Sequence, residues 1–212
     1  MTTTELLALF RSEVFDLELP YLWSDNLIYG YIDDAQKQFC RDTNGIADSR
    51  SFKLNVTVAN EWYSIDPRIL KIRDAVMSST GREVPIISIE KMLENEMRFD
   101  GGTGLVKALI SGLDDGTLRT WPIPSEATTI ELRTFRLPED VAAGDDLEIP
   151  PQYHPRLLHW VKHRAYGVQD TETFDKGASD RYLAMHKAAC LDAIHEQNRV
   201  RRPVSTVSYG GI

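Results

Sequence analysis

Residues 24–58, SDNLIYGYIDDAQKQFCRDTNGIADSRSFKLNVTV, contain two hydrophobic patterns, and the change from one to the other decides the fold. In the first part, apolar residues recur every three or four positions, which predicts an amphipathic helix of about 18 residues with Ser24 as its N-cap. From Phe52 to Val58, apolar and polar residues alternate, which predicts a strand. The apolar stripe of the helix consists of Leu27, Ile28, Tyr31, Ile32, Ala35 and Phe39.

A β-rich block continues from this strand over residues 50–137. Its turn signal DDG lies between two apolar segments and predicts a hairpin. Residues 90–99, EKMLENEMRF, have a pattern typical of a short helix, and RILKIRDAVM fits either an extended or a short helical form. The other segments that we expect to be extended are 62–65, 84–89, 105–111, 117–124 and 128–137.

Helices flank this block on both sides. Residues 4–15 have apolar positions at helical spacing, with Thr3 or Thr4 as the N-cap, and two further helices are predicted at 153–166 and 171–199. Because amphipathic helices must bury their stripes, we expect the terminal helices to pack together. The sequence predicts an α+β fold, with a helical bundle formed by N- and C-terminal helices, an inserted β-rich block and an extended C-terminal arm. The expected parts are helices over 1–49, the β-rich insertion over 50–137, a linker over 138–152, helices over 153–202 and the arm over 203–212.

Composition indicates an ordinary globular protein of one domain or two small ones, with 212 residues of which 42% are hydrophobic and 26% charged. The apolar runs are too short to span a membrane, and the N-terminus lacks the features of a signal peptide. The two cysteines, Cys40 and Cys190, fit helical patterns as small buried hydrophobic residues and indicate no disulfide framework. We therefore expect a cytosolic origin and no association with a membrane.

Charge is distributed unevenly along the chain. Residues 149–212 hold nine basic and six acidic residues, a net charge of +3, whereas residues 1–148 hold 15 basic and 26 acidic residues, a net charge of −11. Such an acidic body argues against a protein that grips duplex DNA, which needs clustered lysine and arginine. It suits a surface that stays near DNA without binding it, and equally one that only keeps the protein in solution.

All five histidines lie in the last third of the chain, which raises the question of a metal site. His159 and His163 are four residues apart on a predicted helix, so they share a face and could chelate a metal. The segment HWVKH has no glutamate where the HExxH motif needs one. His186 and His195 are nine residues apart, on opposite sides of their helix. The sequence therefore predicts neither a metal site nor catalytic residues.

The helix over 153–166 has two distinct faces. The face that we expect in the core consists of Leu157, Leu158, Val161 and Ala165. The opposite face, which we expect outside the core of its own subunit, carries His159, His163 and Tyr166. An aromatic and polar face of this kind predicts a contact with another subunit or helix.

The last ten residues, PVSTVSYGGI, form a separate segment. VSTVSY has strand propensity, the glycines supply flexibility, and the preceding RVRR is positively charged. A frayed terminus and an arm that adds a strand to the edge of a partner's sheet both fit this pattern.

Several motifs, taken in order, resemble those of the head-to-tail adaptor proteins of tailed bacteriophages, also called connector or head completion proteins. The motifs are LWSDNLIYGYIDDAQKQFCRDT, FKLNVTV with WYSIDPRILKI, LRTWPIP with IELRTFRLP, and IPPQYHPRLLHWVKHRAYG with a tail that closes in YGGI. The resemblance spans most of the chain, while residues 75–104 match no motif of the family.

The resemblance implies a structural virion protein without catalysis or cofactor. Adaptors of this kind form a ring, commonly a dodecamer, beneath the portal protein, and tail proteins assemble below the ring. DNA passes through the lumen without sequence-specific binding, and an acidic body would keep the lumen from gripping it. The protein would belong to the head–tail neck of the virion after assembly in the host cytoplasm.

The resemblance also assigns roles to residues. It places His159, His163 and Tyr166 on an intersubunit or portal-facing surface. The arm that docks on the portal would include Arg199, Arg201, Arg202, Val207, Tyr209, Gly210, Gly211 and Ile212. Two other hypotheses remain: another tail ring component, such as a tail terminator or tube protein, or a metal-dependent hydrolase that uses His159 and His163.

Overall fold

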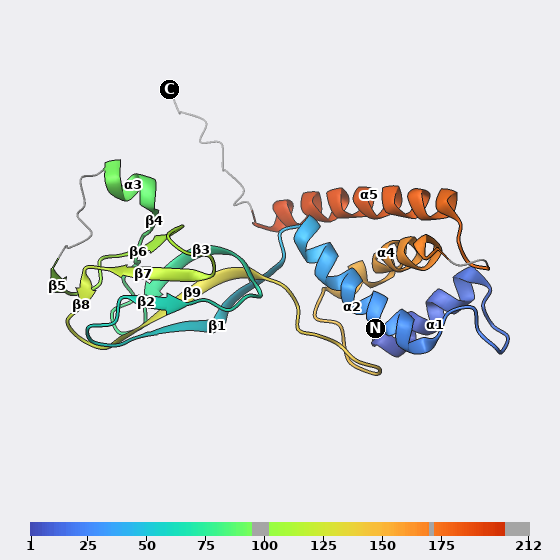
Figure 1. Cartoon of the computed structure of the whole chain (residues 1–212), viewed down its shortest axis with the longest axis horizontal. Coiled ribbons are helices and arrows are strands. Elements are labelled where there is room, and N and C mark those ends of the chain that lie inside the picture. The colour runs from blue at the N-terminus through green and yellow to red at the C-terminus, as the bar shows by residue number, and fades with distance from the viewer. Residues whose placement is uncertain (95–101, 170–171, 202–212) are drawn as a thin grey trace, which may run out of the picture. The chain divides into compact units, whose positions relative to one another are not determined.

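A computed structural model describes residues 1–94, 102–169 and 172–201. The chain divides into two compact units (Figure 1). The helical unit comprises Met1–Asn44 with the described part of Pro138–Ile212, and the β unit comprises the described part of Gly45–Leu137. Helices from both ends of the chain and a β-rich middle confirm the predicted α+β class. The predicted arm, 203–212, lies outside the described residues.

Four α-helices and a short 3-10 helix build the described part of the helical unit. They are α1 (Thr3–Val14), α2 (Asp25–Asp42), η1 (Pro151–Tyr153), α4 (His154–Gly167) and α5 (Lys176–Arg201). As predicted, α2 has 18 residues and Ser24 as its N-cap. The N-cap predicted for α1 was wrong, because Thr2 takes this position. The Thr2 hydroxyl accepts a hydrogen bond from the Glu5 N–H, and the Glu5 carboxylate accepts one from the Thr2 N–H.

Helix α4 is central to the helical unit and packs against α1, α2 and α5. The four apolar residues predicted to face the core are all buried: Leu157, Leu158, Val161 and Ala165. Full burial of one leucine side chain stabilises a fold by about 1.5–3 kcal/mol, so this stripe is a main source of stability for the unit. The predicted stripe of α2 is also buried, except that Leu27 is 39% exposed. Leu27 lies about 100° around the helix axis from Ile28, at the edge of the stripe.

The first sheet of the β unit has the order β1-β9-β3, and both of its pairings are antiparallel. Its strands are β1 (Ile46–Val56), β3 (Ile69–Met77) and β9 (Thr128–Arg136). The segment RILKIRDAVM, which fitted two conformations, is extended and forms β3. Strand β1 starts earlier and ends earlier than the predicted 52–58, and the alternation of Phe52, Leu54 and Val56 points these three side chains into the core.

The second sheet has the order β2-β7-β6-β4. Its strands are β2 (Trp62–Ser64), β4 (Ile86–Ser88), β6 (Ala108–Ser111) and β7 (Thr117–Trp121). Strands β6 and β7 are the antiparallel hairpin predicted around DDG, while β4 joins β6 in parallel. Residues from both sheets share one apolar core, which includes Leu109, Leu118 and Ile130.

Three short elements complete the described part of the β unit. Strands β5 (Thr103–Gly104) and β8 (Ile123–Pro124) pair in parallel. Helix α3 (Ile89–Glu94) covers the start of the helix predicted at 90–99, whose remainder lies outside the described residues. Among the helices of residues 1–94, 102–169 and 172–201, none has the length and apolarity that a membrane span requires.

Candidate functional site

The face of α4 that carries His159, His163 and Tyr166 is covered by α5 of the same chain. All three side chains are half-buried and none is among the buried core residues, although α5 packs against this face. His163 Nδ1 lies 3.0 Å from the Ser179 carbonyl oxygen, and the Ser179 hydroxyl donates to the His163 carbonyl oxygen at 3.0 Å. The Tyr166 ring stacks on Tyr182 of α5 with 5.9 Å between ring centroids.

This arrangement has a clear electrostatic consequence for His159. Burial is the main cause that lowers the pKa of its imidazole below the usual value of 6.5, and the nearby Lys162 ammonium lowers it further. A neutral, half-buried imidazole fits a packing role between helices. The contact of this face with another helix, which the sequence predicted as one of two options, is thus made within the chain. Its contact with another subunit or with a portal stays a prediction.

An exposed apolar loop connects α1 to α2, and no sequence pattern had marked it as functional. We define the apolar loop as residues 15–22, FDLELPYL. Phe15 is 87% exposed and Leu19 is 78% exposed, and Leu17 and Leu22 are also exposed. Isolated exposed apolar side chains are common, but five large ones within eight residues, with Tyr21 as the least exposed, are typical of a surface that binds another protein.

A buried ion pair fixes the backbone of the apolar loop. The Arg11 guanidinium donates to the Asp16 carboxylate at 2.6 Å, and both side chains are almost fully buried. The other oxygen of Asp16 accepts a hydrogen bond from the Leu22 N–H at 3.0 Å, so one carboxylate joins the two ends of the loop. The Arg11 guanidinium also lies 3.5 Å above the centre of the Tyr21 ring. The loop therefore presents its apolar side chains from a rigid frame.

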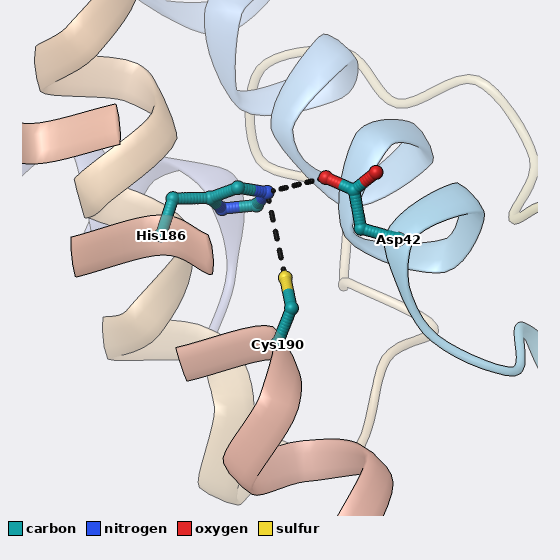
Figure 2. A group of neighbouring side chains, drawn as sticks. All are labelled: Asp42, His186 and Cys190. Carbon is teal, nitrogen blue, oxygen red and sulfur yellow. Dashed lines mark hydrogen bonds and ion pairs between the residues drawn. The ribbon is translucent and has the colours of Figure 1, made fainter. Parts of the chain in front are cut away.

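A second cluster lies between the C-terminal end of α2 and the middle of α5. Figure 2 shows Asp42 from α2 and His186 and Cys190 from α5, with their polar atoms directed toward one another. His186 Nε2 lies 2.9 Å from Asp42 Oδ2 and 3.4 Å from Cys190 Sγ. His186 is 0% exposed and Cys190 is 3% exposed, whereas Asp42 reaches the solvent. All three groups offer atoms that can bind a metal ion, and these atoms lie within 4.8 Å of one another.

The chemistry of this cluster is set by burial. Burial lowers the pKa of His186 below 6.5, while the Asp42 carboxylate counteracts this shift. Burial also raises the pKa of the Cys190 thiol to about 12. The neutral imidazole then donates a hydrogen bond from its Nε2–H to the Asp42 carboxylate, and the Cys190 thiol stays protonated near neutral pH. A protonated thiol is a poor nucleophile, so the cluster has no activated cysteine.

The sequence alone could have brought together two of the three residues of this cluster. His186 and Cys190 are four residues apart on a predicted helix and therefore share a face, which is the signal in the sequence that could have paired them. Asp42 could not be paired with them, because its contact depends on how α2 packs against α5. The prediction that His186 and His195 do not converge is confirmed, since His186 is buried and His195 is exposed. Both cysteines are buried, as predicted.

The residues predicted for the docking arm fall into two groups. Arg199 and Arg201 lie in α5, so the helix extends past the predicted end at residue 199 and these two are not part of an extended segment. The others lie outside the described residues: Arg202, Val207, Tyr209, Gly210, Gly211 and Ile212.

Helices at both ends of the sequence, a β-rich middle and an exposed apolar loop fit a structural protein of the phage head-to-tail adaptor class. The chain belongs to such a family: the profile described as SU10 adaptor protein matches residues 1–208. This confirms the resemblance found in the sequence motifs. Among the curated proteins, none matches the chain. Membership in the family implies association with portal and tail components and a place in the neck of the virion.

Proposed function

We propose that this chain is the subunit of a homo-oligomeric ring, expected to be a dodecamer, that joins the portal protein to the tail and lines the DNA passage. The observation that supports this most strongly is the family match, which covers residues 1–208 of a chain of 212. The role is structural and needs neither a catalytic step nor a cofactor. Assembly takes place in the host cytoplasm, before the finished neck becomes part of the virion.

The apolar loop, residues 15–22, is our proposed contact between neighbouring subunits. Burial of apolar surface contributes roughly 25 cal/mol per Å², and the exposed side chains of Phe15, Leu17 and Leu19 have this surface available. Because the pair of Arg11 and Asp16 already fixes the loop, little conformational entropy remains to be lost on docking. A ring requires heterologous contacts, in which the loop of one subunit meets a different surface of the next.

The solvent-accessible part of the α4 face that carries His159, His163 and Tyr166 is a second proposed contact, either with a neighbouring subunit or with the portal. His163 lines an open hollow of about 340 Å³ whose wall also includes Tyr31 and Arg164. The half-buried His159 and Tyr166 belong to the same face. Aromatic and arginine side chains at the rim of a hollow are well suited to receive a side chain of a partner, since such residues are enriched in protein interfaces.

The end of the chain is our proposed portal-docking arm. Arg199, an exposed residue of α5, places a positive charge shortly before the start of this arm in the sequence. The strand propensity of VSTVSY suits the addition of a strand to an exposed sheet edge of the portal. The proposed docking residues are Arg199, Arg201, Arg202, Val207, Tyr209, Gly210, Gly211 and Ile212.

The proposal for DNA passage rests on charge. Residues 1–148 carry a net charge of −11, and acidic surfaces repel the phosphates of DNA over distances of about 8–10 Å at ordinary ionic strength. We propose that acidic residues line the lumen and that passing DNA makes no sequence-specific contact with it.

Head–tail joining in vitro tests the proposed function. Filled heads that contain the portal but lack this protein are mixed with tails, with and without the purified chain, and joined particles are counted by electron microscopy. We expect joining only when the chain is present and bound at the portal vertex. Equal joining in its absence would contradict the proposal.

A further inference from the structure

We propose that Asp42, His186 and Cys190 form a binding site for a divalent transition-metal ion of the zinc class. The site lies within the helical unit, between α2 and α5 (Figure 2). It is independent of the proposed adaptor function, and the two His159 and His163 imidazoles that the sequence raised as metal ligands take no part in it.

The spacing of the three groups fits tetrahedral coordination. With bonds of about 2.3 Å to sulfur and about 2.0 Å to nitrogen and oxygen, tetrahedral angles place sulfur about 3.5 Å and oxygen about 3.3 Å from the nitrogen. The distances from His186 Nε2 are 3.4 Å to Cys190 Sγ and 2.9 Å to Asp42 Oδ2. The third separation, between the Asp42 oxygen and Cys190 Sγ, is within 4.8 Å, against about 3.5 Å in a tetrahedron, so a movement of at most about 1 Å admits the ion. His186 and Cys190 are held in this geometry because they lie four residues apart on one helix.

The donor types select the class of ion. One thiolate, one imidazole and one carboxylate form a mixed set that suits zinc and related ions, whereas calcium and magnesium prefer oxygen ligands alone. The charges also balance, because a thiolate and a carboxylate together neutralise a divalent cation. A neutral assembly is much less costly to bury than an isolated charge.

Binding changes the protonation of two groups. The Cys190 thiol loses its proton to solvent as the sulfur–metal bond forms, and His186 keeps one proton, which moves from Nε2 to Nδ1. The exposed Asp42 gives the ion and the released proton a route to the solvent, and a water molecule completes the coordination. His186 Nδ1 has no hydrogen-bond partner among the described residues. We therefore expect an affinity about 10- to 100-fold weaker than that of a site with such a partner.

Cobalt(II) titration of the full-length, chelator-treated and reduced protein tests the site, because a cobalt–thiolate bond gives a charge-transfer band in the near ultraviolet. We expect the band to saturate at one equivalent, to be lost in Cys190→Ser, and to need about tenfold or more cobalt in His186→Gln and Asp42→Asn. Excess zinc should remove the band. His195→Gln is the matched control, since it removes an exposed histidine of the same helix and should leave the titration unchanged.

Three results would overturn the assignment. They are no cobalt–thiolate band in the unaltered protein, a band of full strength in Cys190→Ser, and a band lost in Cys40→Ser but kept in Cys190→Ser. Circular dichroism establishes that each variant is folded. If Cys190→Ser does not fold, the titration of the unaltered protein and of Asp42→Asn decides the question.

Discussion

The carboxylate of Asp16 accepts a hydrogen bond from the guanidinium of Arg11 at 2.6 Å, in a place where both side chains are almost free of solvent contact. This pair closes the apolar loop between α1 and α2 and keeps its exposed side chains directed outward. A buried, paired charge lies directly beneath an exposed apolar surface. The arrangement links the stability of the helical unit to the surface that we assign to assembly.

Asp16→Asn should destabilise the helical unit by about 3 kcal/mol. Loss of one partner of a buried ion pair costs about 3–5 kcal/mol, and the lower end applies because Arg11 keeps a contact with Asp25. Urea denaturation measures the change in the free energy of unfolding. Glu18→Gln, an exposed change in the same loop, is the control and should alter stability by less than about 0.5 kcal/mol. Equal effects of the two changes would contradict the anchoring role of Asp16.

Phe15→Asn combined with Leu19→Ser should separate assembly from stability. Residue 15 has a positive φ of 58°, which asparagine adopts more readily than phenylalanine, so folding should be preserved. We expect the free energy of unfolding to change by less than about 0.5 kcal/mol, and self-association on the portal to weaken by about tenfold or more. Val58→Ser, at an exposed valine of the β unit, is the control. Unchanged ring formation by the double variant would rule out the apolar loop as a subunit contact.

Leu157→Ala should destabilise the protein by about 2–5 kcal/mol, because it leaves a cavity where α4 meets its neighbours. Leu191→Ala removes the same atoms from an exposed position on α5 and should cost less than about 0.5 kcal/mol. Thermal and urea denaturation of both variants give the comparison. Similar losses in the two variants would mean that α4 is not the centre of the core.

Acidification should destabilise the helical unit through His154. Burial lowers the pKa of this histidine below 6.5, although its hydrogen bond to the Ile149 carbonyl oxygen counteracts the shift. As the pH falls below about 6.5, the unfolded chain binds this proton before the folded chain does. The stabilising contribution is thus complete above pH 6.5 and is lost as the pH approaches the lower, folded pKa. Denaturation of the unaltered protein and of His154→Gln between pH 7.5 and about pH 5 should show a smaller decrease for the variant.

The sequence was sufficient for features that depend on neighbouring residues. The stripe of α2, the core face of α4 and the hairpin of β6 and β7 follow from periodicity and a turn signal, and the structure confirms them. The order of the strands could not be predicted in this way. Strand β9 lies between β1 and β3, which are separated from it by tens of residues, and alternation of apolar residues does not state which strands pair.

The candidate sites show the same limit of sequence reasoning. Helical projection treats α4 alone and therefore gave no partner for His159, His163 and Tyr166, whereas α5 packs on that face. Asp42 was missed for the same reason, since its neighbours in space are more than 140 residues away along the chain. Apolar and acidic residues alternate from Phe15 to Leu19 of the apolar loop, but alternation does not state which side chains are exposed, and only the folded chain shows this.

Deletion of residues 203–212 should abolish portal binding and leave the free energy of unfolding of the subunit within about 0.5 kcal/mol of its original value. The segment acts in docking under our proposal, so its loss removes the contact with the portal and not the core. Sedimentation of the truncated chain with purified portal, compared with urea denaturation of the same sample, measures both quantities. Normal docking of the truncated chain would contradict the arm hypothesis.

Light scattering of the purified chain, alone and mixed with its portal, tests the central claim most directly. We predict that the chain adds to the portal as a closed set of copies, one for each portal subunit, so that the molar mass rises to that of two stacked rings. The Phe15→Asn, Leu19→Ser variant keeps the arm but loses the proposed subunit contact, so it should reach this mass only at about tenfold or higher concentration. No rise in mass with the unaltered chain, under conditions in which both proteins are folded, would contradict its assignment as the adaptor ring.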